Sequence, residues 1–358
     1  MSYNEIRKNT KRVKVGSIFI GGDSPISVQS MTNTDTHDIE ATYRQVLSLE
    51  RAGCDIVRIT VPDESSAVIF SALKERGIRV PLVADIHFNH KIAVLAIKCG
   101  ADKIRINPGN IGSEEGVAAV VAAAKEYGVP IRIGVNAGSL SNELLEKYGR
   151  PTPEALVESA LSHVEILERY GFYDTVISIK ASTVSDMIEA NKLLSAKVDY
   201  PLHLGVTEAG FGLDAAVKSS LGIGSLLSMG IGDTIRVSLT DSPEEEVKLA
   251  VRILSELGLR KRQGMNIISC PTCGRTKIDL ISLTRRFTDA ARLAGVIDKP
   301  ISVALMGCAV NGPGEAREAD IGIAGGAGEG LLFKNGEVIR KIPESLLVDE
   351  LISEIQKM

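Results

Sequence analysis

The stretch VPLVADIHFNHKIAVLAIKCGADKIRIN (80–107) shows the unit from which most of this chain is built. A short, branched apolar run (80–87) is followed by a helical pattern, and a second such run (102–107) comes next. Similar runs lie at 26–31, 55–60, 130–136, 174–182, 201–208 and 234–241. Eight strand–helix units over roughly 250 residues are typical of a (β/α)8 barrel. We therefore predict an α/β protein whose N-terminal part is a (β/α)8, or TIM, barrel.

A doubly wound open sheet is the main alternative for the same pattern. Such sheets more often have about five to seven strands. In dinucleotide-binding sheets, a G-x-G-x-x-G motif opens the first strand–helix unit, and this chain has no such motif there. The barrel is therefore favoured.

The repeating pattern ends at a charged junction, LGLRKRQGMN (257–266). Beyond it, a strand-like segment, a helix over about 276–293, further strands, a hairpin turn at Asn335-Gly336 and a final helix from Pro343 indicate an α+β domain. We predict a barrel domain at 1–260, opened by a hairpin at 13–22, and a smaller domain at 261–358.

The composition excludes several classes of protein. The net charge is −4, aromatic residues make up 4% and tryptophan is absent, which is unlike a nucleic-acid-binding surface. The longest stretch of small apolar residues, 116–124, is too short to cross a membrane, and the N-terminus does not resemble a secretory signal. Five cysteines, an odd number, indicate a reducing interior rather than a disulfide framework. We expect a cytoplasmic enzyme.

Polar residues occupy alternate positions near the ends of the predicted barrel strands. Alternate residues point into a barrel, and the C-terminal strand ends form its active site. The predicted inward residues are Arg58, Asp85, His87, Arg105, Asn107, Arg132, Asn136, Lys180, His203, Arg236 and Ser238. A solvated layer of salt bridges is the simpler interpretation for any single member. Together, however, so many basic groups in a concave site require an anion, and arginine favours phosphate oxygens.

The sequence therefore predicts a compact polyanionic ligand, most simply a diphosphate. Asp85 and Glu208 are the carboxylates that remain for binding hydroxyl groups or transferring protons. His37, His90 and His163 lie in a loop or on helices, and we interpret them as structural or surface residues.

The second domain contains three thiols. Cys270 and Cys273 form a C-x-x-C motif, a spacing that lets two thiolates hold one metal or cluster, and Cys308 follows later. Glu315 comes seven residues after Cys308 and is a candidate fourth, more labile ligand. An iron–sulfur cluster is favoured over zinc, which stays open as an alternative. The remaining cysteines, Cys54 and Cys99, precede barrel strands and are interpreted as buried structural residues.

Long motifs then point to one family. SCPTCGR, MGCAVNGPGEA, VADIHFN, KIRINPGN, IRIGVNAGS and PLHLGVTEAG closely resemble the bacterial two-domain 4-hydroxy-3-methylbut-2-enyl diphosphate synthases, over nearly the whole chain. The barrel is also similar to that of dihydropteroate synthase, and the second domain to those of sulfite and nitrite reductases.

This resemblance implies a [4Fe-4S] cluster held by Cys270, Cys273, Cys308 and Glu315. It implies reductive ring opening of 2-C-methyl-D-erythritol 2,4-cyclodiphosphate in the barrel, with flavodoxin or ferredoxin as electron donor. The catalytic candidates are then Glu315, Glu208, Asp85 and His87. It also implies a head-to-tail homodimer in which each cluster domain closes over its partner's barrel.

Two other functions stay open. One is a phosphate-binding barrel lyase or transferase whose second domain is stapled by structural zinc. The other is a non-enzymatic interaction module.

Overall fold

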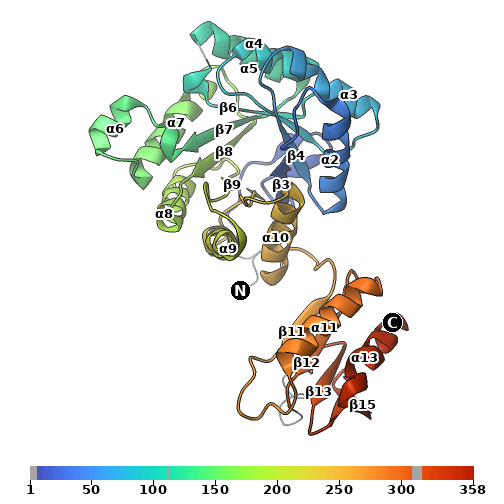
Figure 1. Ribbon diagram of the computed structural model, residues 1–358. Helices are drawn as coiled ribbons and strands as arrows, with labels where there is room; N and C mark the ends of the chain where they lie inside the picture. The colour runs from blue at the N-terminus through green and yellow to red at the C-terminus, as the bar shows by residue number, and fades with distance from the viewer. Residues whose placement is uncertain (1–5, 112, 309–316) are drawn as a thin grey trace. The chain divides into compact units, whose positions relative to one another are not determined.

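The computed structural model describes residues 6–111, 113–308 and 317–358. The chain forms two compact units, Met1–Arg260 and Lys261–Met358 (Figure 1). No helix in the described part of the chain is both long and apolar enough to span a lipid bilayer.

The N-terminal unit is a parallel eight-stranded barrel. Its strands follow the order β8-β7-β6-β5-β4-β3-β10-β9, and a parallel bridge between Ile177 and Leu202 brings β8 next to β9. The predicted (β/α)8 barrel is thereby confirmed. The strands are β3 (Ser27–Met31), β4 (Ile56–Thr60), β5 (Leu82–Asp85), β6 (Lys103–Ile106), β7 (Ile131–Asn136), β8 (Thr175–Lys180), β9 (His203–Leu204) and β10 (Thr234–Ile235).

Helices surround these strands (Figure 1). They are α2 (Ile39–Arg51), α3 (Ile69–Glu75), α4 (His90–Lys98), α5 (Glu114–Tyr127), α6 (Asn142–Tyr148), α7 (Pro153–Arg169), α8 (Val184–Ser195), α9 (Gly212–Ser228) and α10 (Pro243–Glu256). Asp38 caps α2, since its side chain accepts a hydrogen bond from the backbone N–H of Ala41. Ser242 is the N-cap residue of α10 and makes no side-chain capping bond, and proline begins that helix.

The last two barrel strands are shorter than the sequence predicts. The runs at 201–208 and 234–241 each contribute only two residues to the sheet. After β10, the N–H of Leu239 donates to the Glu246 carboxylate on α10, 3.2 Å away, instead of to a neighbouring strand. A side chain from the following helix therefore takes the place of the sheet partner.

A hairpin closes the barrel at the N-terminal ends of its strands. Strands β1 (Val13–Val15) and β2 (Ile18–Ile20) pair antiparallel, and their apolar residues pack with Ile56, Val83 and Val176. These three residues therefore point inward at the N-terminal ends of their strands. The alternate residues of these strands, such as Val57, point outward to the helices and belong to the larger core. Because strand side chains alternate, the polar residues two or four positions further along line the inside above the hairpin.

The C-terminal unit is a five-stranded sheet in the order β11-β12-β13-β14-β15. Two helices pack on one face of this sheet. Their apolar residues and those of that face form one core. Strands β11 to β13 are parallel, and the remaining pairs are antiparallel. The elements are β11 (Asn266–Ser269), α11 (Leu280–Leu293), β12 (Ser302–Met306), β13 (Ile321–Gly325), β14 (Glu329–Lys334), β15 (Glu337–Pro343) and α13 (Leu347–Gln356).

The predicted turn at Asn335-Gly336 is present, with φ of 50° and 82°. The two predicted helix starts in this unit were wrong by several residues. Residues 276 and 277 form a turn with Cys273 and Gly307, which delays α11 to Leu280. Before α13 a 3-10 turn, Glu344–Leu346, occupies the first residues assigned to the last helix.

Candidate functional site

Asp85 is the centre of a buried ionic cluster at the end of β5. Its side chain is 1% exposed, and its carboxylate oxygens lie 3.2 Å from Arg58, 3.4 Å from Arg105 and 3.5 Å from His87. Burial alone would raise the pKa of Asp85, but Arg58, His87 and Arg105 outweigh it and hold that pKa well below its usual range. The carboxylate is therefore ionised and orients both guanidinium groups. Burial has the opposite effect on a cation, and it lowers the pKa of Arg58 to about 10.

A second carboxylate, Glu246, pairs with Arg236, which directly follows the last barrel strand, β10. The sequence did not single out Glu246. Arg236 donates to both oxygens of Glu246 on α10, with the shorter contact at 3.1 Å. Ser30 on β3 donates to the same carboxylate at 2.9 Å. Part of the positive charge predicted for ligand binding is thus already balanced within the protein.

A deeper basic layer lies between this cluster and the hairpin. It contains Lys103, 0% exposed, and Arg132, 2% exposed, which donates to Gln29 at 2.9 Å. His203 is also fully buried, with Thr234 3.4 Å from its Nδ1. Burial and the nearby charge of Arg132 lower the pKa of His203 well below its ordinary value, so the imidazole is neutral.

Lys103 and Gln29 were not predicted as site residues. Lys103 lies two positions before Arg105 on β6, so its inward orientation could have been deduced from the alternation. Gln29 offered no comparable charge signal. Lys180, predicted and found inside, is 8% exposed, and burial and Arg236 lower its pKa well below its usual value.

Several buried polar atoms of this interior have no hydrogen-bond partner among the described residues. They are Nε of Arg58, Nζ of Lys103, Oδ1 of Asn107, Nε of Arg132 and Nε2 of His203. Nearly all of them are donors or lie on basic groups. Buried donors left unpaired are costly, and an anion would satisfy them. The geometry therefore supports a compact, negatively charged ligand.

Two glycines make room for the basic side chains. A Cβ on Gly134 of β7 would lie 2.5 Å from Nε of Arg105, and one on Gly205 would lie 3.0 Å from Nζ of Lys180. The missing side chains let these cations lie across neighbouring strands.

Replacing Gly134 by alanine should displace the Arg105 guanidinium and leave the barrel folded, because the end of a flexible side chain can move. We expect kcat/KM to fall by about 100-fold, since small misplacements of a positioning group have effects of that order. Gly138→Ala is the matched control, because no atom lies within 4 Å of its added Cβ. Equal activity of the two variants would contradict this role for Gly134.

The remaining predicted residues lie in loops after the strands or at their ends. Asn136 ends β7 and is half-buried, Ser238 is half-buried beyond β10, and His87 is exposed beside Asp85. Glu208 is exposed and adopts a φ of 55°, a left-handed conformation that is uncommon for residues other than glycine. Such strain is found preferentially at functional sites.

The three histidines interpreted as structural occupy different surroundings. His37 is exposed between Asp35 and Asp63, at 2.9 and 3.0 Å, and these hydrogen bonds raise its pKa. His163 on α7 is buried against Gly109, whose added Cβ would lie 2.5 Å from the imidazole. His90 begins α4.

In the C-terminal unit, two cysteines lie at the same edge of the sheet. Cys270 follows β11 directly and Cys308 follows β12 by two residues, and these strands are parallel neighbours paired at Ser269 and Leu305. The N–H of Gly307 donates to Sγ of Cys270 at 3.3 Å. The strand pairing therefore brings the C-x-x-C motif to the segment that contains Cys308.

Cys273 lies exposed in the loop beyond Cys270. Its N–H donates to Thr276 Oγ1 at 3.1 Å, and hydrogen bonds from the backbone and side chain of Arg275 lower the pKa of its thiol. All five cysteines of the chain are free, so none of these thiols is used in a disulfide.

Comparison with known proteins agrees with both halves of this description. Residues 10–251 match the model of the GcpE TIM-barrel domain, and residues 266–357 match that of the GcpE protein C-terminal domain. The chain belongs to the GcpE family.

Curated GcpE relatives match over nearly their whole length. The chain is 59% identical over 354 residues to a protein of Caldanaerobacter subterraneus subsp. tengcongensis, covering 99% of this chain and 98% of the relative. A Clostridium perfringens protein is 58% identical over 350 residues, covering 98% and 99%. Both relatives are named 4-hydroxy-3-methylbut-2-en-1-yl diphosphate synthase (flavodoxin).

A solved structure outside the GcpE family is similar in fold. The type I 3-dehydroquinate dehydratase of Clostridium difficile superposes with a TM-score of 0.50 at 14% identity, covering 70% of this chain and 97% of that one. At this identity the likeness concerns the barrel fold alone.

The cysteines of this GcpE chain fit an iron–sulfur cluster by their chemistry. Soft, unpaired thiols gather at one sheet edge, beside a pocket of about 260 Å3 lined by Cys270 and the first turn of α11. Within the described ranges no three His, Cys, Asp or Glu residues are close enough together to hold a metal ion. The predicted fourth ligand, Glu315, lies outside the described residues.

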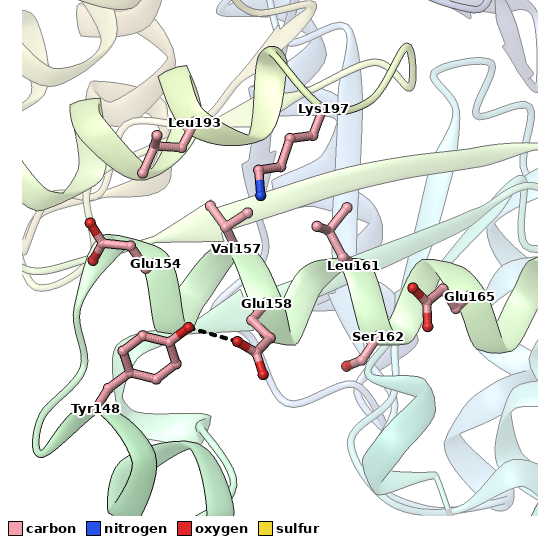
Figure 2. Close-up of a pocket in the computed structure, with 9 residues that line it drawn as sticks. All are labelled: Tyr148, Glu154, Val157, Glu158, Leu161, Ser162, Glu165, Leu193 and Lys197. Carbon is pink, nitrogen blue, oxygen red and sulfur yellow. Dashed lines mark hydrogen bonds between the residues drawn. The ribbon is translucent and has the colours of Figure 1, made fainter.

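A larger pocket, of about 510 Å3, lies on the outer surface of the barrel between α6, α7 and α8. Figure 2 shows Glu154, Glu158 and Glu165 among its lining residues, with Tyr148 donating to Glu158. Its carboxylates would repel a diphosphate, and none of its lining residues belongs to a barrel strand. The candidate site of this GcpE chain is therefore the basic barrel interior.

Proposed function

We propose that this protein catalyses the reductive ring opening of 2-C-methyl-D-erythritol 2,4-cyclodiphosphate to 4-hydroxy-3-methylbut-2-en-1-yl diphosphate, a step of isoprenoid precursor biosynthesis. The reaction consumes two electrons and a proton, breaks a carbon–oxygen bond to phosphate and releases a hydroxyl as water. The observation that carries the proposal is the buried, incompletely satisfied basic layer around Asp85. Membership of the GcpE family supports the same reaction.

The barrel residues have the chemistry that this substrate requires. Arg58, Arg105 and Lys180 can donate to the diphosphate oxygens, and the same groups stabilise the phosphate oxyanion that leaves when the ring opens. Asn107, Asn136, His203 and Ser238 supply neutral polar groups, and Arg132 and Arg236 add positive charge. Binding the leaving oxygen in a site sheltered from water favours the transition state over the bound substrate.

Asp85 is ionised and keeps two arginines in position. Its role is therefore to orient these cations and to accept a hydrogen bond from a substrate hydroxyl, and not to donate a proton. His87, exposed next to it, and Glu208, in its strained loop, are the remaining candidates for proton transfer.

Cys270, Cys273, Cys308 and Glu315 would hold a [4Fe-4S] cluster, which when bound supplies the electrons and a Lewis-acidic iron. The thiols at the shared end of β11 and β12 support this assignment. Electrons would come from flavodoxin, the donor in the names of the relatives, or from ferredoxin. We further propose a homodimer in which each cluster domain closes over the partner's barrel. The active site would then be complete only in the dimer.

A carboxylate ligand exchanges more readily than a thiolate, because oxygen is a poor match for the softer iron site. A Glu315→Cys variant should therefore keep its cluster, with visible absorption retained, and lose most of its turnover. Absorption spectra and steady-state rates check this expectation. Near wild-type turnover would show that exchange at this ligand is not needed.

The decisive experiment is an anaerobic assay of the purified protein with the cyclodiphosphate and reduced flavodoxin. Formation of the linear allylic diphosphate, seen by mass spectrometry, is the expected result. Metal analysis separates this function from a phosphate-binding lyase or transferase with a zinc-stapled domain. Brown, air-sensitive protein supports the cluster, whereas a colourless protein with one zinc per chain and no product would refute both cluster and reaction.

A further inference from the structure

Lys103 is a basic side chain that the reaction described above does not yet use. It lies on β6, two positions before Arg105 and next to Val83 in the sheet register, so it points inward one layer closer to the hairpin. The residue is 0% exposed, and Nζ has no hydrogen-bond partner among the described residues. A lysine without a partner at such depth is rare in proteins and calls for a functional explanation.

The charged groups that face this amine are mostly positive. The charges that act on it come from Arg132 on β7 and Arg58 on β4, and the neutral imidazole of His203 on β9 is a further neighbour. No carboxylate acts on Lys103 among the described residues, and the buried carboxylate of Asp85 is already paired with Arg58 and Arg105. Burial, aided by the charges of Arg132 and Arg58, lowers the pKa of Lys103 well below its ordinary value.

We propose that the Lys103 amine lies at the base of the anion site and accepts a proton when the anion binds. This amine is neutral in the ligand-free barrel and takes up a proton from solvent when a diphosphate binds in the layer above. This inference rests on the proposed function, because it requires a diphosphate at that place. Lys103 is a positioning residue in this scheme: it adds one positive charge beneath the ligand only while the ligand is present.

The physical reason is linkage between the two charges. Without an anion, an ammonium group here would add to an excess of positive charge in a dry interior, so the amine loses its proton. A bound diphosphate reverses the sign of the local potential and raises the pKa of Lys103 again. Proton uptake on binding means that affinity weakens as pH rises through the interval between the ligand-free and ligand-bound pKa values.

Calorimetry can measure this proton directly. The cyclodiphosphate carries one ionised oxygen on each phosphorus and does not titrate near neutral pH, so any proton exchanged on binding belongs to the protein. The full-length protein is titrated with the cyclodiphosphate, without reductant, in buffers of equal pH and different ionisation enthalpy. Wild type should take up about one proton per site, and its affinity should decrease with increasing pH.

The Lys103→Met variant should bind the cyclodiphosphate without proton uptake and with affinity lowered by about 10-fold or more. Its ligand-free form should be at least as thermostable as wild type, because an apolar chain of similar length replaces an unpartnered amine. Lys180→Met is the matched comparison, because burial lowers the pKa of this lysine as well. The proposal expects this variant to bind more weakly and to keep the proton uptake, whereas loss of the uptake would assign the proton to Lys180.

Each result decides between explanations. Unchanged proton uptake in Lys103→Met, or loss of uptake in Lys180→Met, would overturn the assignment to Lys103. Absence of proton uptake in wild type would also overturn the assignment to Lys103, even if both variants failed to fold. If Lys103→Met does not fold, proton uptake retained in Lys180→Met still supports the assignment to Lys103. Failure of the cyclodiphosphate to bind wild type would instead contradict the proposed function itself.

Discussion

A Cys308→Ser variant should be colourless and inactive, with the C-terminal unit still folded. Serine would put a hard oxygen ligand in place of one of the three thiolates that are proposed to hold the cluster. Cys308 lies two residues beyond β12, so the substitution leaves the hydrogen bonds between β11 and β12 intact. The expected result is loss of visible absorption and of bound iron together with loss of product formation, at unchanged far-UV circular dichroism.

Cys99→Ser is the matched control for Cys308→Ser. Cys99 is a half-buried thiol at the end of α4 in the barrel unit, and burial raises the pKa of its thiol. The other barrel cysteine, Cys54, is buried, and its pKa rises to about 12, so neither thiol is a ready ligand. The control should keep its iron, colour and activity. A brown, active Cys308→Ser protein would remove this cysteine from the proposed ligand set.

An Asp85→Asn variant should be the most damaging single change within the barrel. The amide keeps the shape of the side chain but leaves Arg58 and Arg105 without their shared counter-charge. Removing one partner of a buried ion pair typically costs about 3 kcal/mol, which lowers Tm by about 10 °C in a domain of this size. Turnover should fall by at least about 100-fold, because the carboxylate that orients the substrate is gone.

Added anions distinguish an electrostatic effect from simple loss of packing. Inorganic diphosphate should raise the Tm of Asp85→Asn more than that of wild type, because it replaces the missing negative charge beside the two arginines. Glu245→Gln, which breaks an exposed ion pair with Lys248, is the control and should change Tm little. A variant with wild-type Tm, unaffected by diphosphate, would show that Asp85 does not balance these cations.

The alternation of the strands made much of the candidate site predictable. Side chains two residues apart share a face in any strand, so the inward positions of Arg58, Asp85 and Arg105 follow once the strands are recognised. The eight strand–helix repeats likewise predict the barrel from local patterns. Lys103 obeys the same alternation but begins β6, whereas the predicted site residues lie near the C-terminal ends of the strands.

The helix boundaries in the C-terminal unit show where local patterns fail. Residues 276–279 continue a plausible helical pattern, yet the backbone N–H of Lys277 donates to Gly307 O at 2.9 Å. That bond joins segments thirty residues apart in the chain, and no local signal announces it. Tertiary contacts override helix propensity at such places.

What the sequence determined by itself was the architecture, the inward set of basic residues and the cysteine motif, because each is a repeat or spacing within a short segment. Only the tertiary structure decided how the charges are distributed. It paired Arg236 with Glu246, placed the Arg105 side chain over Gly134, and left Nζ of Lys103 without a hydrogen-bond partner among the described residues. Ion pairing and burial depend on distances between strands and helices far apart in the chain, and those distances exist only once the barrel has closed.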